Sequence, residues 1–236
     1  MGRAFEYRKA AKFARWDRMA KAFTRAGKEI ALAIKSGGAN PDTNANLRRA
    51  IQNAKSAQMP KDRIEAAIKR ATAKDATGFS EVVYEAMGPH GSAIVIETAT
   101  DNPTRTVANL RAILNKNGGS MGTQGMHDFI FERKGVFKIN AANLDMDELE
   151  LELIDAGLDS LEKNEEEQYV LYTKFADFGS MQKALEDKGL EVLSAELQRI
   201  PSIGKELNEE QTDEVLELID KLEQDDDVQT VFHNLA

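Results

Sequence analysis

The sequence of 236 residues has no cysteine, one tryptophan and three histidines. The absence of cysteine excludes disulfide frameworks, thiolate catalysis, cysteine-ligated zinc and iron–sulfur clusters, and it fits a cytoplasmic protein. No apolar run approaches the ~18 to 20 residues of a membrane span, and the basic N-terminal segment lacks the apolar stretch of a signal peptide. We therefore expect a globular protein that is neither inserted in a membrane nor exported.

Patterns that support catalysis or metal binding are also scarce. His90, His127 and His233 are scattered, and none has a metal-ligand spacing such as His-x-x-x-His. The sequence has no Gly-x-Ser-x-Gly nucleophile elbow, and the segment 122–125 lacks the Gly-Lys-Ser/Thr ending of a phosphate-binding loop. We predict that the protein is not an enzyme and uses no metal, cofactor or small-molecule substrate.

The formal net charge of −9 conceals a strong separation of charge along the chain. Residues 1–74 carry 18 Lys/Arg and 6 Asp/Glu, a net +12, whereas residues 75–138 are nearly neutral at −1. Residues 139–236 carry 7 Lys/Arg and 27 Asp/Glu, a net −20. A basic segment of this size indicates a nucleic acid or another polyanion as its partner.

The basic segment has the periodicity of three helices. Over 18–35, apolar residues recur at helical spacing with cations on the opposite side, and a Gly-Gly pair ends the pattern. A second helix is predicted after Pro41 and a third from Pro60, a residue that a helix start tolerates. Residues 3–17 either extend the first helix or form an arm. We predict a basic three-helix domain over 1–77.

The remainder of the chain has an α+β pattern. Segments rich in β-branched residues over 81–87 and 92–98 predict two strands joined by a turn. A capping signal at 101–103 begins a helix that reaches about residue 117, and 127–133 is predicted as a further strand. This part forms the start of a middle domain.

Residues 134–203 have the order strand, helix, strand, strand, helix, strand, which is the ferredoxin-like arrangement. The tail adds a helix over 211–222 and a strand over 228–232, and neither can bury its apolar face alone. We therefore assign the tail to the middle domain, 78–133 plus 204–236. The predicted fold class is α+β: a basic N-terminal helical bundle plus two ferredoxin-like α+β domains, one inserted in the other.

Five segments form a distinctive set: KSGGANPDTNANLRRAI at 35–51, MPKDRIEAAIKR at 59–70, TDNPTRTV at 100–107, NKNGG at 115–119 and ERKG at 132–135. Together they resemble the YebC/PmpR family over essentially the whole chain, although Met1–Tyr7 depart from the Gly-His-Ser-Lys-Trp start usual in that family. The resemblance implies a three-domain protein. Most members are catalogued as probable DNA-binding transcriptional regulators, and other relatives act as translational activators on the ribosome.

The basic domain is the strongest functional signal, because Lys and Arg neutralise DNA or RNA phosphates without reading a base sequence. We predict a nucleic-acid-binding regulator of gene expression: a DNA-binding transcriptional regulator or, alternatively, a translational activator that binds ribosomal RNA. The same charge would also suit pairing with the chain's own acidic domains or with an acidic protein partner. The predicted nucleic-acid contacts are Arg8, Lys9, Lys12, Arg15, Arg18, Lys21, Arg25, Lys28, Arg48, Arg49, Lys55, Lys61, Lys69 and Arg70.

The helix that begins after 101–103 is a secondary candidate for a phosphate site, with Arg105, Lys116 and Asn117 as the candidate residues. Helix capping and a glycine turn account for the same pattern without a ligand, and we favour that interpretation. Residues 225–227 are three acids after the tail helix, where they oppose the helix dipole. We expect a solvated loop there, with a cation or a basic surface that uses the acids as the alternative. A basic protein is a further candidate partner, for the acidic domains.

Overall fold

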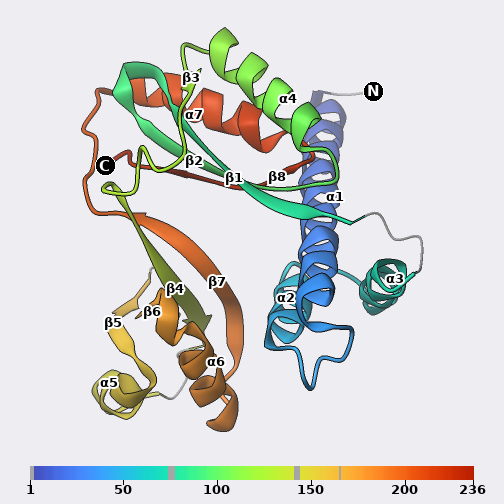
Figure 1. Ribbon diagram of the computed structural model, residues 1–236, viewed down its shortest axis with the longest axis vertical. Helices are drawn as coiled ribbons and strands as arrows, with labels where there is room; N and C mark the ends of the chain where they lie inside the picture. The colour runs from blue at the N-terminus through green and yellow to red at the C-terminus, as the bar shows by residue number, and fades with distance from the viewer. Residues whose placement is uncertain (1–2, 74–77, 141–143, 165) are drawn as a thin grey trace.

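The computed structural model describes residues 3–73, 78–140, 144–164 and 166–236, with the backbone alone for residues 3–17. Figure 1 shows a long N-terminal helix beside two separate sheets, each with its own pair of helices. The fold class is α+β, as the sequence predicts.

The N-terminal helical domain, called the head below, contains α1 (Arg3–Gly37), α2 (Ala45–Ser56) and α3 (Lys61–Ala71). Residues 3–17 extend α1 and do not form an arm. Asn44 fixes the turn between α1 and α2: its amide donates to the Ala33 and Gly38 carbonyls at 2.7 Å each and accepts from the Leu47 amide at 3.1 Å. Half of the buried residues in the core between the three helices are alanines, so the helices pack closely.

The second domain is a four-stranded antiparallel sheet with strand order β3-β1-β2-β8. Helices α4 and α7 lie side by side on one face of it (Figure 1) and bury the domain's main core. The tail strand β8 pairs with β2, so one sheet contains strands that precede the third domain and a strand that follows it in the sequence. Its elements are β1 (Ser80–Met87), β2 (Ala93–Thr100), α4 (Pro103–Lys116), β3 (Ser120–Met121), α7 (Glu209–Glu223) and β8 (Val228–His233).

The third domain is a second antiparallel sheet, with strand order β5-β6-β4-β7. Its strands and helices follow one another as the sequence predicts for a ferredoxin-like unit, and the helices bury a core that contains Phe137 and Leu171. Its elements are β4 (Phe131–Ile139), α5 (Met146–Leu153), β5 (Leu158–Lys163), β6 (Tyr169–Lys174), α6 (Phe178–Asp187) and β7 (Val192–Pro201).

Two predicted details are wrong. No separate strand spans 127–133, because β4 runs without a break from Phe131 to Ile139 and pairs with β7 throughout. The buried Glu85 carboxylate instead accepts from the Gly125 and His127 amides at 2.7 Å each, which holds the preceding segment as a turn against β1. The second domain also departs from ferredoxin-like connectivity, because only a short 3-10 turn (Pro89–Gly91), and no α-helix, separates β1 from β2.

Gly135 explains why the sequence suggests a boundary at this point. It lies in the middle of β4 and is buried. A Cβ added there would lie 2.6 Å from a ring carbon of Phe178 and 2.7 Å from a methyl group of Thr173. The glycine therefore permits close packing inside a strand and does not end one. We keep the proposed domain limits 1–77, 78–133 plus 204–236 and 134–203, except that residues 131–133, the start of β4, are assigned to the third domain.

Candidate nucleic-acid interface

The head is fastened to the second domain through Lys28, which lies midway along α1. Its ammonium group donates to the Asp227 carboxylate at 2.9 Å and to the backbone carbonyls of Ala99 and Asp226 at 2.9 and 2.7 Å. The side chains of Lys28 and Asp227 are only 10% and 6% exposed. Three acceptors replace the water that the buried ammonium loses, so Lys28 is a structural contact between domains.

Asp227 lies at the centre of this junction. Its second carboxylate oxygen accepts from Arg105 at 2.7 Å, from the Thr106 hydroxyl at 2.8 Å and from the Thr100 hydroxyl at 3.2 Å. Burial alone would raise the pKa of Asp227, but the hydrogen bonds from Arg105, Lys28 and Thr106 outweigh it and lower the pKa to about 2. The expectation of a solvated acidic loop is therefore wrong for Asp227; the alternative, a basic surface that uses the acid, is confirmed.

The opposite end of the head contacts the third domain through α2. The Asn53 side chain donates to the Ala195 carbonyl at 3.0 Å and accepts from the Ala195 amide at 3.2 Å, as a neighbouring strand would. The neighbouring Gln52 side chain donates to the Val192 carbonyl, which also belongs to β7. Because β7 is an edge strand, these side chains cover backbone groups that would otherwise be open to pairing with another chain.

Two arginines of α2 take part in the same contact. The Arg48 guanidinium lies 3.4 Å from the Glu186 carboxylate, and the Arg49 guanidinium lies 5.5 Å from the centre of the Phe178 ring. Arg49 also lies 3.5 Å from the Glu29 carboxylate, and burial raises the pKa of Glu29 while Arg49 opposes the rise. Both arginines therefore serve contacts within the chain.

These observations revise the predicted contact set. Lys28 is withdrawn, because its ammonium is buried and fully engaged. Arg25 donates to the Glu223 carbonyl at 2.9 Å, and Arg48 and Arg49 contact the third domain. All four residues are therefore engaged in contacts with the second or third domain, and Lys28 and Arg48 pair there with the acids Asp227 and Glu186.

Five other predicted cations are exposed to solvent: Arg18, Lys55, Lys61, Lys69 and Arg70. Lys61 lies 3.7 Å from Glu65 on the same helix, an exposed pair that contributes little. The other four have no acidic partner among the described side chains. Lys21 is half-buried on α1, and Arg8, Lys9, Lys12 and Arg15 lie in the part of α1 whose side chains are outside the described residues.

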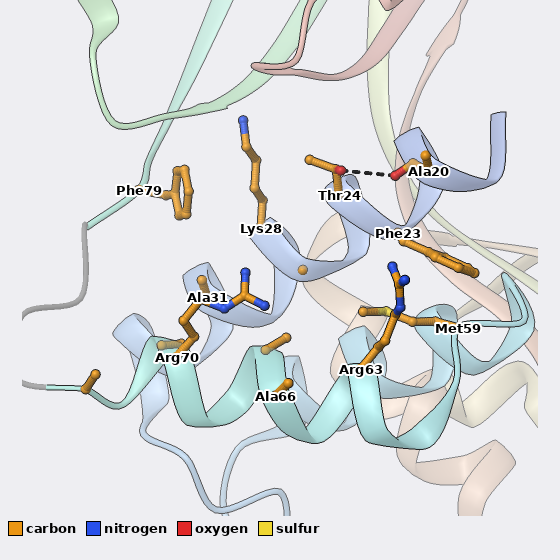
Figure 2. Close-up of a pocket in the computed structure, with 14 residues that line it drawn as sticks. Ala20, Phe23, Thr24, Lys28, Ala31, Met59, Arg63, Ala66, Arg70 and Phe79 are labelled. Atoms are coloured by element: carbon orange, nitrogen blue, oxygen red, sulfur yellow. Dashed lines mark hydrogen bonds between the residues drawn. The ribbon is translucent and has the colours of Figure 1, made fainter. Parts of the chain in front are cut away.

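A groove lies between α1 and α3 (Figure 2), and the exposed Arg70 is among the residues that line it. Its volume is about 690 Å³, and alanines of both helices and a glycine of α1 are prominent among the residues that line it. Arg63 and Arg70 reach towards it from α3, and Arg63 lies 5.8 Å from the centre of the Phe23 ring. The sequence prediction omits Arg63, although its spacing of seven residues from Arg70 places both on one side of α3.

The secondary phosphate candidates have other roles. Arg105 is held by Asp101 at 2.9 Å and by Asp227. Asn117 uses its amide group to donate to Ile113 and its carbonyl to accept from Lys221, both at 2.7 Å. Asn102 caps α4 by accepting from the Arg105 amide, and Gly118 has a positive φ of 74°. Capping and a turn therefore account for this region, and Lys116 alone of the three candidates is exposed without a described partner.

The described residues contain no group of three His, Asp or Glu side chains placed to hold a metal ion. None of the helices in the described part of the chain is both long enough and apolar enough to cross a membrane.

The fold and its charges define a protein class: a basic helical head docked on two acidic α+β domains. A family model described as the TACO1/YebC protein N-terminal domain matches residues 3–74, and one described as the TACO1/YebC second and third domain matches residues 79–235. The chain therefore belongs to the TACO1/YebC family, which confirms the YebC/PmpR resemblance.

Curated relatives share about half of the sequence over its full length. A probable transcriptional regulatory protein of Myxococcus xanthus is 54% identical over 100% of both chains, and one of Cytophaga hutchinsonii is 55% identical over 100% of this chain and 99% of the relative. A crystal structure of a conserved hypothetical protein from Aquifex aeolicus is 34% identical, covers 92% of this chain and 90% of that one, and has a TM-score of 0.80. The chain thus belongs to a family of proteins named as regulators.

Proposed function

We propose that this protein is a nucleic-acid-binding regulator of gene expression that acts in the cytoplasm without catalysing a reaction. The observation that carries the proposal is the division of the head's cations into two sets. One set is consumed by docking onto the acidic domains, and the other lies exposed on α1, α2 and α3. Cations left without acidic partners are available to neutralise phosphates and release counterions.

The way the head docks on the acidic domains also supports nucleic-acid binding by the exposed cations. The head's docking contacts turn part of its charge towards Asp227 and Glu186, so the exposed cations lie where the acidic domains do not cover them. A polyanion is then attracted to the head and repelled by the remainder of the molecule. The acidic surfaces that remain open suit a basic protein partner.

Duplex DNA is the target that the names of the relatives suggest. A second candidate, a translational activator that binds ribosomal RNA, is favoured by one observation. The exposed side chains of α3 include Lys61, Lys69 and Arg70 but no Asn or Gln of the kind that reads adenine in a major groove. Recognition of backbone and shape, which is common for RNA, matches such a surface.

The proposal is tested by reversing exposed charges. We expect the triple substitution Lys61→Glu, Lys69→Glu and Arg70→Glu to weaken binding to labelled duplex DNA and structured RNA, and to lower the salt slope by about 3 if each residue meets one phosphate. The matched control reverses three exposed cations of the acidic domains: Arg111, Lys174 and Lys183. Equal binding by the two folded triple variants would contradict the proposal.

A second experiment separates the two candidate targets. The protein is recovered from lysate with its partners after treatment with RNase or DNase. Co-sedimentation with large ribosomal particles that RNase abolishes and DNase leaves intact would refute the transcriptional function. Release by DNase alone would refute the ribosomal one.

A further inference from the structure

We propose that the groove between α1 and α3 receives an unstacked base from an RNA loop, while Arg63 and Arg70 hold the phosphates on either side. The inference rests on the proposed function, because it assumes that the head binds nucleic acid. It adds a chemical class to that function: the partner presents unpaired nucleotides.

The shape of the groove suits a flat apolar group. One wall is a face of α1 made by Ala20, Thr24, Gly27 and Ala31, and the facing wall of α3 includes Ala66. A Cβ added to Gly27 would meet nothing within 4 Å, so the space above this wall is open. The volume of about 690 Å³ lies within the ~300 to 1,000 Å³ of pockets that enclose small organic molecules, and a nucleotide fits in such a space.

Aromatic rings border the groove. Phe23 from α1 and Phe79 from the segment before β1 both line it, and Figure 2 shows them on different sides. The Arg63 guanidinium lies 5.8 Å from the centre of the Phe23 ring and the Lys28 ammonium lies 5.2 Å from the centre of the Phe79 ring. An inserted base would therefore stack on the faces of these rings that the cations leave open, and such stacking contributes ~1 to 3 kcal/mol and is tolerant of base identity. Lys28 also lines the groove, but its charge is taken up by Asp227, so the interior remains suited to an uncharged ring.

The rim carries the charge that an unpaired strand needs. Seven residues separate Arg63 from Arg70, which places their Cα atoms about 10 Å apart along α3. Both are exposed, and within the described part of the chain neither forms an ion pair. A guanidinium donates in a planar fork that matches phosphate geometry, so two arginines at this spacing can hold phosphates that flank an inserted base.

A duplex uses this groove poorly. In a duplex the bases are stacked inside, so only the two arginines would be engaged and the apolar walls would remain wet. Extruding a base from a duplex costs a few kcal/mol, whereas RNA loops present unstacked bases at little cost. The combination of apolar walls, aromatic borders and a cationic rim therefore favours RNA loops over duplex DNA.

The test compares a labelled RNA hairpin with an eight-nucleotide loop, the same stem closed as a full duplex, and the DNA version of the hairpin. Fluorescence anisotropy at fixed salt is expected to show that the native protein binds the RNA hairpin at least tenfold more tightly than the duplex. Ala66→Leu fills the groove without changing charge and is expected to reduce this preference to less than threefold, with duplex binding unchanged. Ala112→Leu, at an exposed position of α4, adds the same bulk elsewhere as the matched control.

The outcomes separate the inference from the proposed function. No binding to any of the three probes overturns the proposed function itself. Equal binding to hairpin and duplex, or an undiminished preference in the folded Ala66→Leu variant, overturns the groove inference and leaves the function standing. Equal binding to the DNA hairpin and the RNA hairpin overturns the assignment to RNA. If an acidic amphipathic peptide binds the groove without displacing the RNA hairpin, the groove is a site for a protein helix instead.

A second measurement covers the case in which Ala66→Leu fails to fold. A 4-thiouridine placed in the loop is irradiated in complex with the native protein, and the cross-linked peptide is identified. Cross-linking to the peptide that contains Phe23 or to the one that contains Phe79 supports the inference. Cross-linking confined to the acidic domains overturns it.

Discussion

Replacing Asp227 with Asn tests whether the buried junction fixes the head to the second domain. The substitution keeps a hydrogen-bond acceptor of the same size but removes the charge that faces Lys28 and Arg105. A pKa of about 2 against an ordinary 3.8 means that the ionised form favours the folded state by about 2 kcal/mol. The same loss judged from Lys28, which stays buried beside an uncharged partner, is that of breaking a buried pair and costs ~3 to 5 kcal/mol.

We therefore expect Asp227→Asn to lower the free energy of unfolding by about 2 to 5 kcal/mol. The assay is urea unfolding followed by circular dichroism at pH 7. Asp226→Asn is the matched control, since it removes an equal charge from the adjacent residue. The Asp226 side chain is exposed, and only its backbone carbonyl contacts Lys28. A difference between the two variants smaller than about 0.5 kcal/mol, the usual effect of a surface substitution, would refute the reasoning.

The pH dependence gives an independent check. The folded pKa of Asp227 lies below the ordinary value, so its contribution to stability is present above pH 3.8 and is lost as the pH falls towards 2. Native protein should therefore lose stability over this range more steeply than Asp227→Asn. Identical acid profiles for the two proteins would also contradict the assignment.

Two further predictions concern packing at the third domain. Gly135→Ala should lower the thermal midpoint and cost about 1 to 3 kcal/mol, because the added methyl group meets the buried Phe178 ring; Gly179→Ala, with open space around it, is the control and should be neutral or slightly stabilising. Asn53→Ala should cost about 1 to 3 kcal/mol by leaving the β7 backbone unsatisfied. Asn53→Ala should also self-associate more in sedimentation experiments than Asn46→Ala, a control at an exposed position of α2. If the two variants self-associate equally, the proposed role of Asn53 in covering the β7 edge is contradicted.

The helices of the head follow from local periodicity, which is why the sequence predicts them well. Lys28 shows where that reasoning ends: its angular position on α1 is that of a solvated cation, and only the tertiary fold brings Asp227, 199 residues later, beside it. Asp227 is equally concealed, because nothing within a run of three acids distinguishes the buried member from its neighbours. The position of a charge on a helix predicts which side it faces but not what that side meets.

The groove is concealed for a similar reason. Arg63 and Arg70 share one side of α3 by spacing alone, and the small residues of α1 share a face in the same way. The sequence does not fix the distance between the two helices. A spacing that leaves about 690 Å³ open between them is a property of the packed head, so the residues of the groove are predictable and the space is not.

The junction at Asp227 also constrains the order in which this protein can be completed. The head lies at the start of the chain, whereas Asp227 and the strand β8 that closes the second sheet follow the whole third domain. During synthesis, the head and the third domain can therefore form their local contacts well before the second sheet has its last strand. The contacts of Lys28 with Asp226 and Asp227 form only when the last part of the chain arrives, so the junction that orients the cationic surface is completed at the end of folding.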